Sequence, residues 1–209
     1  VKILLGYADR YLKYPYHTNS APKQPKGLSG GHIDEQTLGE ATALSRQIAP
    51  AYDLIHDSPA LSDADRKAVE EQLILPMLKN IDKHKAGKSN WQTWHNAAML
   101  WGGAVIGDEA WIRKAIEQPG QGFAFQMSHC LSEEGMWYEN SWGYHFYTLD
   151  ALVETCEGAR RLGIDLWSHP NLKKMFLLPI RYAMANGSLP RFGDDVNAST
   201  QRIGSLGEP

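Results

Sequence analysis

The stretch ENSWGYHFYTL, residues 139–149, decides how the rest of the chain is interpreted. Five aromatic or imidazole rings fall within six positions: Trp142, Tyr144, His145, Phe146 and Tyr147. A helix needs an apolar residue only at every third or fourth position to bury one face. The excess of rings predicts a helix, from about Ser141 to Leu162, that packs on one side and faces a ligand on the other.

The spacing within this helix predicts which face is buried. The three-and-four pattern of Phe146, Leu149, Val153 and Cys156 forms the expected packed stripe. At about 100° per residue, Tyr144 lies roughly 200° around the axis from Phe146, so we expect it to point away from that stripe. A surface tyrosine beside a surface histidine is the plain alternative.

Helical periodicity extends over most of the 209 residues, which predicts an all-α protein with a single domain. The other predicted helices cover residues 1–14, residues 34–56, a long segment capped by Ser62 that Pro76 interrupts, segments beginning at 89, 108 and 123, and residues 170–185 with Pro179 inside. Short connections favour antiparallel helical hairpins. An open superhelix and a closed toroid around a cavity both fit, while residues 15–31 form a long irregular loop and residues 188–209 an irregular end.

Composition excludes several classes of protein. The net charge is −3 and basic residues are scattered, so nucleic acid is not an expected partner. No run of about 18 apolar residues predicts a membrane span. Cys130 and Cys156 form no metal-binding pattern, and sequence leaves open whether they pair. The chain opens without Met or a signal segment, which we interpret as a mature chain or a piece of a longer one.

A second segment, SNWQTWHNAAMLW at residues 89–101, also has two kinds of face. Tryptophans at 91, 94 and 101 belong to the predicted packed stripe, whereas Gln92, His95 and Asn96 share the opposite side. Amides and an imidazole donate and accept hydrogen bonds in fixed directions, which suits a polyhydroxylated or carboxylate-bearing ligand. Ser89 or Asn90 occupies the N-cap position.

A third segment, SLPRFGDDVN at residues 188–197, carries Arg191 followed by Asp194 and Asp195. A surface turn is the plain interpretation. Two adjacent Asp residues without further ligands are a weak metal signal, so no metal site is expected.

In this order, SNWQTWHNAA, EEGMWYENSWGYHFYTL and LPRFGDD resemble the heparinase II/III-like and alginate lyase group of polysaccharide lyases, over roughly residues 30–195. The resemblance implies an (α/α) toroid, here an incomplete barrel of helical hairpins, followed by an antiparallel β-sandwich that this chain lacks. It also implies β-elimination on a uronate polysaccharide, with alginate as first choice and a heparan-type glycosaminoglycan as second. A secreted or periplasmic protein without a cofactor is expected.

The resemblance also implies roles for single residues. Asn90 neutralises the C5 carboxylate, Tyr144 transfers the proton, and His145 and His95 assist, while a further histidine comes from the β-sandwich. The expected substrate-binding set is Gln92, Trp91, Trp94, Trp137, Trp142, Glu139 and Arg191.

Two alternatives stay open. A toroid-type glycoside or unsaturated-uronyl hydrolase needs paired carboxylates, and the candidates are Asp34, Glu35, Glu139, Asp194 and Asp195. A non-catalytic carbohydrate-binding helical module is the second alternative.

Overall fold

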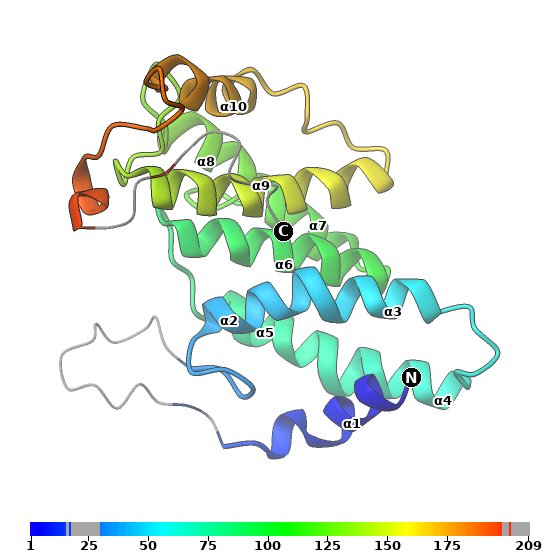
Figure 1. The fold of residues 1–209 in the computed structure, drawn as a ribbon. Helices are drawn as coiled ribbons and strands as arrows, with labels where there is room; N and C mark the ends of the chain where they lie inside the picture. Colours follow the sequence, from blue (N-terminus) through cyan, green and yellow to red (C-terminus); the bar gives the residue numbers. More distant parts are fainter. Residues whose placement is uncertain (16, 18–29, 198–200, 202–209) are drawn as a thin grey trace.

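The computed structural model describes residues 1–15, 17, 30–197 and 201, and its described residues form helices joined by loops (Figure 1). No strand occurs within these ranges, and an isolated antiparallel bridge pairs Leu131 with Trp137. The all-α prediction is therefore confirmed. Most of the predicted 15–31 loop, and part of the predicted irregular end at 188–209, lie outside the described residues.

The helices follow the expected order. They are α1 (Lys2–Arg10), α2 (Thr37–Ala43), α3 (Ala49–Ile55), α4 (Asp63–Val69), α5 (Leu75–Lys83), α6 (Asn90–Val105), α7 (Glu109–Glu117), α8 (Phe123–His129), α9 (Trp142–Arg161) and α10 (Pro170–Tyr182). Short 3₁₀ turns occur at η1 (Tyr11–Lys13) and η4 (Gly193–Asn197). The α10 helix continues through Pro179 and ends at Tyr182, although a proline inside a helix is a possible break.

Two π-helical turns join shorter helices into longer ones. The turn η2 (Leu44–Ile48) links α2 to α3, and η3 (Glu70–Ile74) links α4 to α5. Each ends two residues before a proline, Pro50 or Pro76. Proline has no N–H to donate to the carbonyl four residues earlier, and a widened π turn accommodates such a gap. The irregularity expected at Pro76 is thus a π turn placed just before it.

Side-chain caps fix where the helices begin. Ser62 and Asp65 form a reciprocal capping box at α4. The Ser89 hydroxyl accepts from the Trp91 N–H at the start of α6, and the Ser141 hydroxyl accepts from the Tyr144 N–H at the start of α9. Because Ser89 is the cap, the side chain of Asn90 remains available for another partner.

Helix α6 runs through the middle of the molecule, with α9 beside it (Figure 1). The two helices run parallel, because Trp94 contacts Tyr147 with ring centroids 5.4 Å apart and Trp101 Nε1 donates to the Glu154 carbonyl at 2.9 Å. Both pairs are separated by 53 positions. Their close approach needs Gly158, since a Cβ there would meet Leu100 Cδ2 at 2.3 Å.

The predicted packed stripe of α9 is confirmed at Leu149 and Cys156 and is wrong at Phe146 and Val153. Its buried residues include Trp142, His145, Thr148, Ala151, Leu152, Thr155, Cys156, Gly158 and Ala159. Leu149 is also buried, but Phe146 and Val153 are only half-buried and line a surface pocket. The helix touches both α6 and α10, so its buried surface is wider than the single stripe that the spacing suggested.

Cys130 and Cys156 are both buried and free. Burial raises the pKa of the Cys130 thiol to about 11 and that of Cys156 to about 12. Within the described ranges, no helix combines the length and apolar character needed to cross a membrane.

Candidate functional site

The first turn of α9 presents Tyr144 to solvent. Its side chain is 37% exposed, and it lines a pocket of about 460 Å³ together with Ser141, Gly143, Tyr147, Asp194 and Asp195. The Ser141 cap accepts from the Tyr144 N–H at 3.2 Å. The prediction that Tyr144 points away from the packed face agrees with this exposure.

At the start of α6, the side-chain amide of Asn90 is paired with a carboxylate. Asn90 Nδ2 lies 2.9 Å from both Oε1 and Oε2 of Glu139, and Trp137 Nε1 donates to Glu139 Oε2 at 2.5 Å. A carboxylate without a proton can only accept, so the amide must present its nitrogen to it. Asn90 is 4% exposed, and its amide nitrogen is held by Glu139 in this structure.

Asn90 and Tyr144 lie at the same end of two parallel helices. The separation of 53 positions between α6 and α9 puts Asn90 level with Gly143, the residue before Tyr144. Glu139, the partner of Asn90, precedes α9 by only three residues. The pocket that Tyr144 lines does not include Asn90. Tyr144 is thus partly exposed to solvent, whereas Asn90 is buried.

His145 is fully buried, and both ring nitrogens contact the backbone. Nδ1 accepts from the Trp137 N–H at 3.3 Å, and Nε2 lies 3.1 Å from the Met175 carbonyl. Because a carbonyl only accepts, the proton belongs on Nε2. Burial lowers the pKa of His145, partly offset by the Met175 carbonyl. This geometry is typical of a structural histidine that ties α9 to α10.

The polar face predicted for α6 is inside the protein. Gln92 Oε1 accepts from the Ala86 N–H at 2.9 Å, Gln92 Nε2 donates to Asn96 Oδ1 at 2.9 Å, and Asn96 Nδ2 donates to the Gln121 carbonyl at 2.8 Å. All three side chains of this face, His95 included, are at most 2% exposed. The expectation that they face a ligand does not fit this arrangement, because the partners of the two amides include backbone groups of the loop before α6 and of the loop between α7 and α8.

His95 has no such partner. Neither ring nitrogen has a hydrogen bond among the described residues. Burial, with a smaller effect from His84, lowers the pKa of His95 to about 3. The imidazole is therefore neutral at any ordinary pH.

The tryptophans expected to stack on sugars are mostly in the core. Trp94, Trp137 and Trp142 are at most 1% exposed, whereas Trp91 is half-buried. The Arg46 guanidinium lies 4.5 Å from the Trp94 ring centroid and covers one face. The three buried rings thus have no free face for a sugar, because the segments packed around α6 and α9 cover them.

The remaining candidates lie on the third segment. Arg191 is exposed and donates to the Val196 carbonyl at 3.3 Å. Asp194 is exposed, whereas Asp195 is 3% exposed and accepts from backbone N–H groups of α9. Across the described part of the chain, no group of three or more His, Cys, Asp or Glu side chains could hold a metal ion.

Sequence analysis missed a cluster around Arg46. Arg46 pairs with Asp150 at 2.8 Å and with Glu154 at 3.3 Å, in addition to covering Trp94. Arg46 and Asp150 are 104 positions apart, and no local pattern in the sequence signals such a contact.

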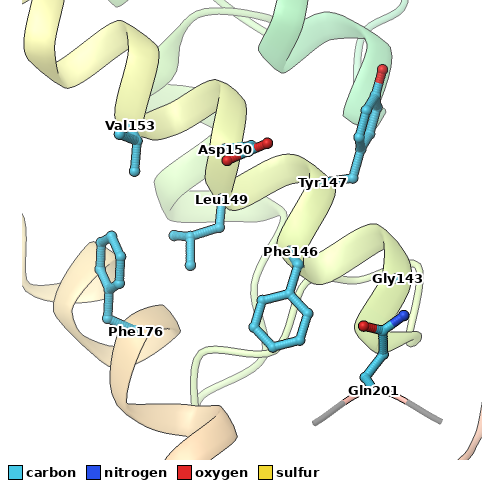
Figure 2. Close-up of a pocket in the computed structure, with 8 residues that line it drawn as sticks. All are labelled: Gly143, Phe146, Tyr147, Leu149, Asp150, Val153, Phe176 and Gln201. Atoms are coloured by element: carbon cyan, nitrogen blue, oxygen red, sulfur yellow. The ribbon is translucent and has the colours of Figure 1, made fainter. Parts of the chain in front are cut away.

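A second pocket, of about 380 Å³, adjoins this part of α9. Figure 2 shows Phe146, Leu149 and Val153 of α9 pointing toward the side of Phe176, while Tyr147 points away from them. The pocket is largely apolar and lies between α9 and α10.

The geometry can be compared with known proteins. No curated protein matches the chain. The family model described as alginate lyase matches residues 10–188. This match spans most of the 209 residues and includes both helix starts that carry Asn90 and Tyr144, so the chain belongs to the alginate lyase family.

Proposed function

We propose that this chain is the helical catalytic part of a polysaccharide lyase that cleaves a uronate polymer by β-elimination. Alginate is our first choice of substrate, and a heparan-type glycosaminoglycan is our second. Family membership supports the reaction class. The observation that carries the proposal is that an exposed tyrosine and a carboxylate-binding amide lie at the same end of the parallel helices α6 and α9.

In β-elimination a proton leaves C5 of the uronate and the glycosidic oxygen leaves C4. The proton at C5 is hard to remove because a second negative charge develops beside the carboxylate. Hydrogen-bond donors aimed at that carboxylate stabilise the developing charge. Asn90 is the donor in this proposal, and its amide already holds a carboxylate, that of Glu139. The substrate carboxylate must therefore replace Glu139 as acceptor.

Tyr144 transfers the proton. Its side chain is partly exposed and lines a pocket to which a polymer has access. A tyrosine hydroxyl group carries a proton that it can donate to the departing glycosidic oxygen. His145 and His95 support the helices in this proposal rather than touching substrate, because both are buried.

The wider architecture belongs to the same proposal. The helices form an (α/α) toroid, a β-sandwich domain outside this chain supplies the general base, and the protein acts in the periplasm or outside the cell, where such polymers occur. Arg191 is exposed near the pocket-lining Asp194 and is the proposed additional contact for the polyanion.

The hydrolase alternative loses support because most of its candidate carboxylates have other partners. Glu139 accepts from Asn90 and Trp137, and Asp195 accepts from the start of α9. Asp34 accepts from the Gln36 N–H at 2.9 Å in a local turn.

The test is a turnover assay of the full-length protein on a panel of uronate polysaccharides. A lyase creates a conjugated double bond that absorbs in the ultraviolet, whereas hydrolysis of a saturated polymer does not. Tyr144→Phe should lower kcat by about 10²-fold or more. Tyr7→Phe is a matched control, because Tyr7 on α1 is 38% exposed and Tyr144 37%.

Three results would contradict the proposal. The first is cleavage without the chromophore, which would favour the hydrolase. The second is binding of the polymer without any cleavage, which would favour the non-catalytic module. The third is normal turnover in Tyr144→Phe.

A further inference from the structure

The start of α9 is capped by a residue from far along the chain. Asp195 Oδ1 accepts from the Gly143 N–H at 3.1 Å, and Asp195 Oδ2 accepts from the Trp142 N–H. These are the first two amides of the helix, which have no acceptor within the helix itself. Asp195 is 3% exposed. Its carboxylate therefore satisfies two backbone donors that would otherwise be buried without partners.

The turn that carries Asp195 is built against the same helix start. Trp142 Nε1 donates to the Pro190 carbonyl at 3.0 Å, and Leu189 belongs to the same small buried cluster as Trp142. Gly193 has a φ of 54°, and a Cβ there would stand 2.0 Å from the Asn140 carbonyl oxygen. Only glycine fits both the conformation and the space.

Tyr144 is the residue that follows these two amides. Its own N–H is held by the Ser141 hydroxyl at 3.2 Å, so side chains fix the first three amides of α9. A negative charge at this position also interacts favourably with the positive end of the helix dipole. The direction in which Tyr144 leaves the backbone is consequently set by Asp195 and Ser141 together.

We propose that Asp195 is a positioning residue for Tyr144: by binding the Trp142 and Gly143 amides, it holds the first turn of α9 so that the Tyr144 hydroxyl group meets the polymer. This role rests on the proposed lyase function. It assigns a purpose to the GDD segment other than metal binding or paired-carboxylate catalysis.

The experiment compares two capping carboxylates in the full-length protein. Asp195→Asn replaces one acceptor oxygen by a donor that faces a backbone N–H. Asp108→Asn makes the same change at the start of α7, a different helix from the one that carries Tyr144. There Asp108 Oδ1 accepts from the Ala110 N–H at 2.9 Å. Misplacement of a reacting group by about 1 Å lowers turnover by up to about 10²-fold. We expect Asp195→Asn to lower kcat at least tenfold with KM changed less than threefold, and Asp108→Asn to leave both within twofold.

A second variant moves the turn without changing its charge. Gly193→Ala pushes the turn away from Asn140, so kcat should fall in the same way while KM is retained. This variant decides the question if Asp195→Asn does not fold. Hydrogen exchange at the Trp142 and Gly143 amides gives a readout without turnover, and we expect faster exchange in both variants but not in Asp108→Asn.

The outcomes separate this inference from the proposed function. If the wild-type protein forms no unsaturated product, the lyase function and this role both fail. If the wild type is active and folded Asp195→Asn or Gly193→Ala keeps its kcat, only the positioning role is overturned. Equal loss of kcat in Asp108→Asn would also overturn it, because the effect would then follow from general loss of stability.

Discussion

The starts of α6 and α9 look alike in sequence and differ in the structure. Each follows a serine cap and crowds aromatic rings among polar groups. On α6, Gln92 and His95 are 1% exposed, whereas Tyr144 on α9 is 37% exposed. Helix α6 runs through the middle of the molecule (Figure 1) and contacts α2, α3, α5, α7, α8 and α9, whereas Tyr144 in the first turn of α9 lines a pocket. The comparison teaches that uncharged polar groups on a helix indicate an interior network as readily as a ligand site.

The largest effect is expected where the two helix starts are joined, at Asn90 and Glu139. Asn90→Asp would bring two carboxylates together in a nearly buried place, at a cost of about 3–5 kcal/mol in the free energy of unfolding. Glu139→Gln in the same chain exchanges donor and acceptor without changing either side-chain length. We expect the double variant to regain most of the lost stability in denaturant unfolding.

This swap has a clear control and a clear contradiction. Asn90→Ala removes the donors without adding charge, so it should cost less than Asn90→Asp. Equal stability of Asn90→Asp with and without Glu139→Gln would show that the 2.9 Å contacts between these residues do not matter for stability. Activity should stay low in the double variant, because the carboxylate introduced at position 90 would repel the substrate carboxylate.

The next effect concerns the buried polar face of α6. Gln92→Ala should lower the free energy of unfolding by about 1–3 kcal/mol, because the Ala86 N–H and Asn96 would lose their partner. Gln72→Ala, at an exposed glutamine, should change it by less than about 0.5 kcal/mol. Thermal unfolding measures both. Loss of turnover in Gln92→Ala without loss of stability would instead restore the idea that this face meets a ligand.

Acid should weaken the fold through the buried histidines. The pKa of His95 is lowered to about 3, so between about pH 6.5 and 3 the unfolded chain binds a proton that the folded chain does not. Stability is then constant above about pH 6.5 and falls by about 1.4 kcal/mol per pH unit below it for this group. His145, whose pKa is also lowered by burial, acts in the same direction.

Denaturant unfolding at several pH values checks this slope. His95→Leu should flatten it, since both ring nitrogens lack partners among the described residues. His129→Gln removes an exposed imidazole and should leave the slope unchanged. An unaltered slope in His95→Leu would mean that His95 is not buried in its neutral form.

The sequence predicted the positions of the helices better than the contacts that their side chains make. The starts of two helices followed from local chemistry, such as the Ser62 cap and the cap expected at Ser89 or Asn90, because a cap and its amide are only a few residues apart. The π turns before Pro50 and Pro76 had no such signal beyond the prolines themselves.

The candidate site was predictable only in part. The exposure of Tyr144 followed from helical geometry. The partners of Asn96 and His145 include backbone carbonyls of distant segments, that of Gln121 25 positions away and that of Met175 30 positions away. Backbone groups are present at every residue and leave no trace in a sequence. The interior role of these side chains therefore became visible only with the fold.

The smallest effect is expected at the open end of α9. Tyr144→Phe should change the free energy of unfolding by less than about 0.5 kcal/mol, because the side chain is 37% exposed and no described residue forms a hydrogen bond with its hydroxyl group. The same variant should lose most of its turnover. Thermal unfolding of Tyr144→Phe beside Gln92→Ala makes the comparison direct. If Tyr144→Phe proved as destabilising as Gln92→Ala, Tyr144 would have a structural role like that of Gln92. The proposed difference between the buried polar face of α6 and the exposed start of α9 would then be wrong.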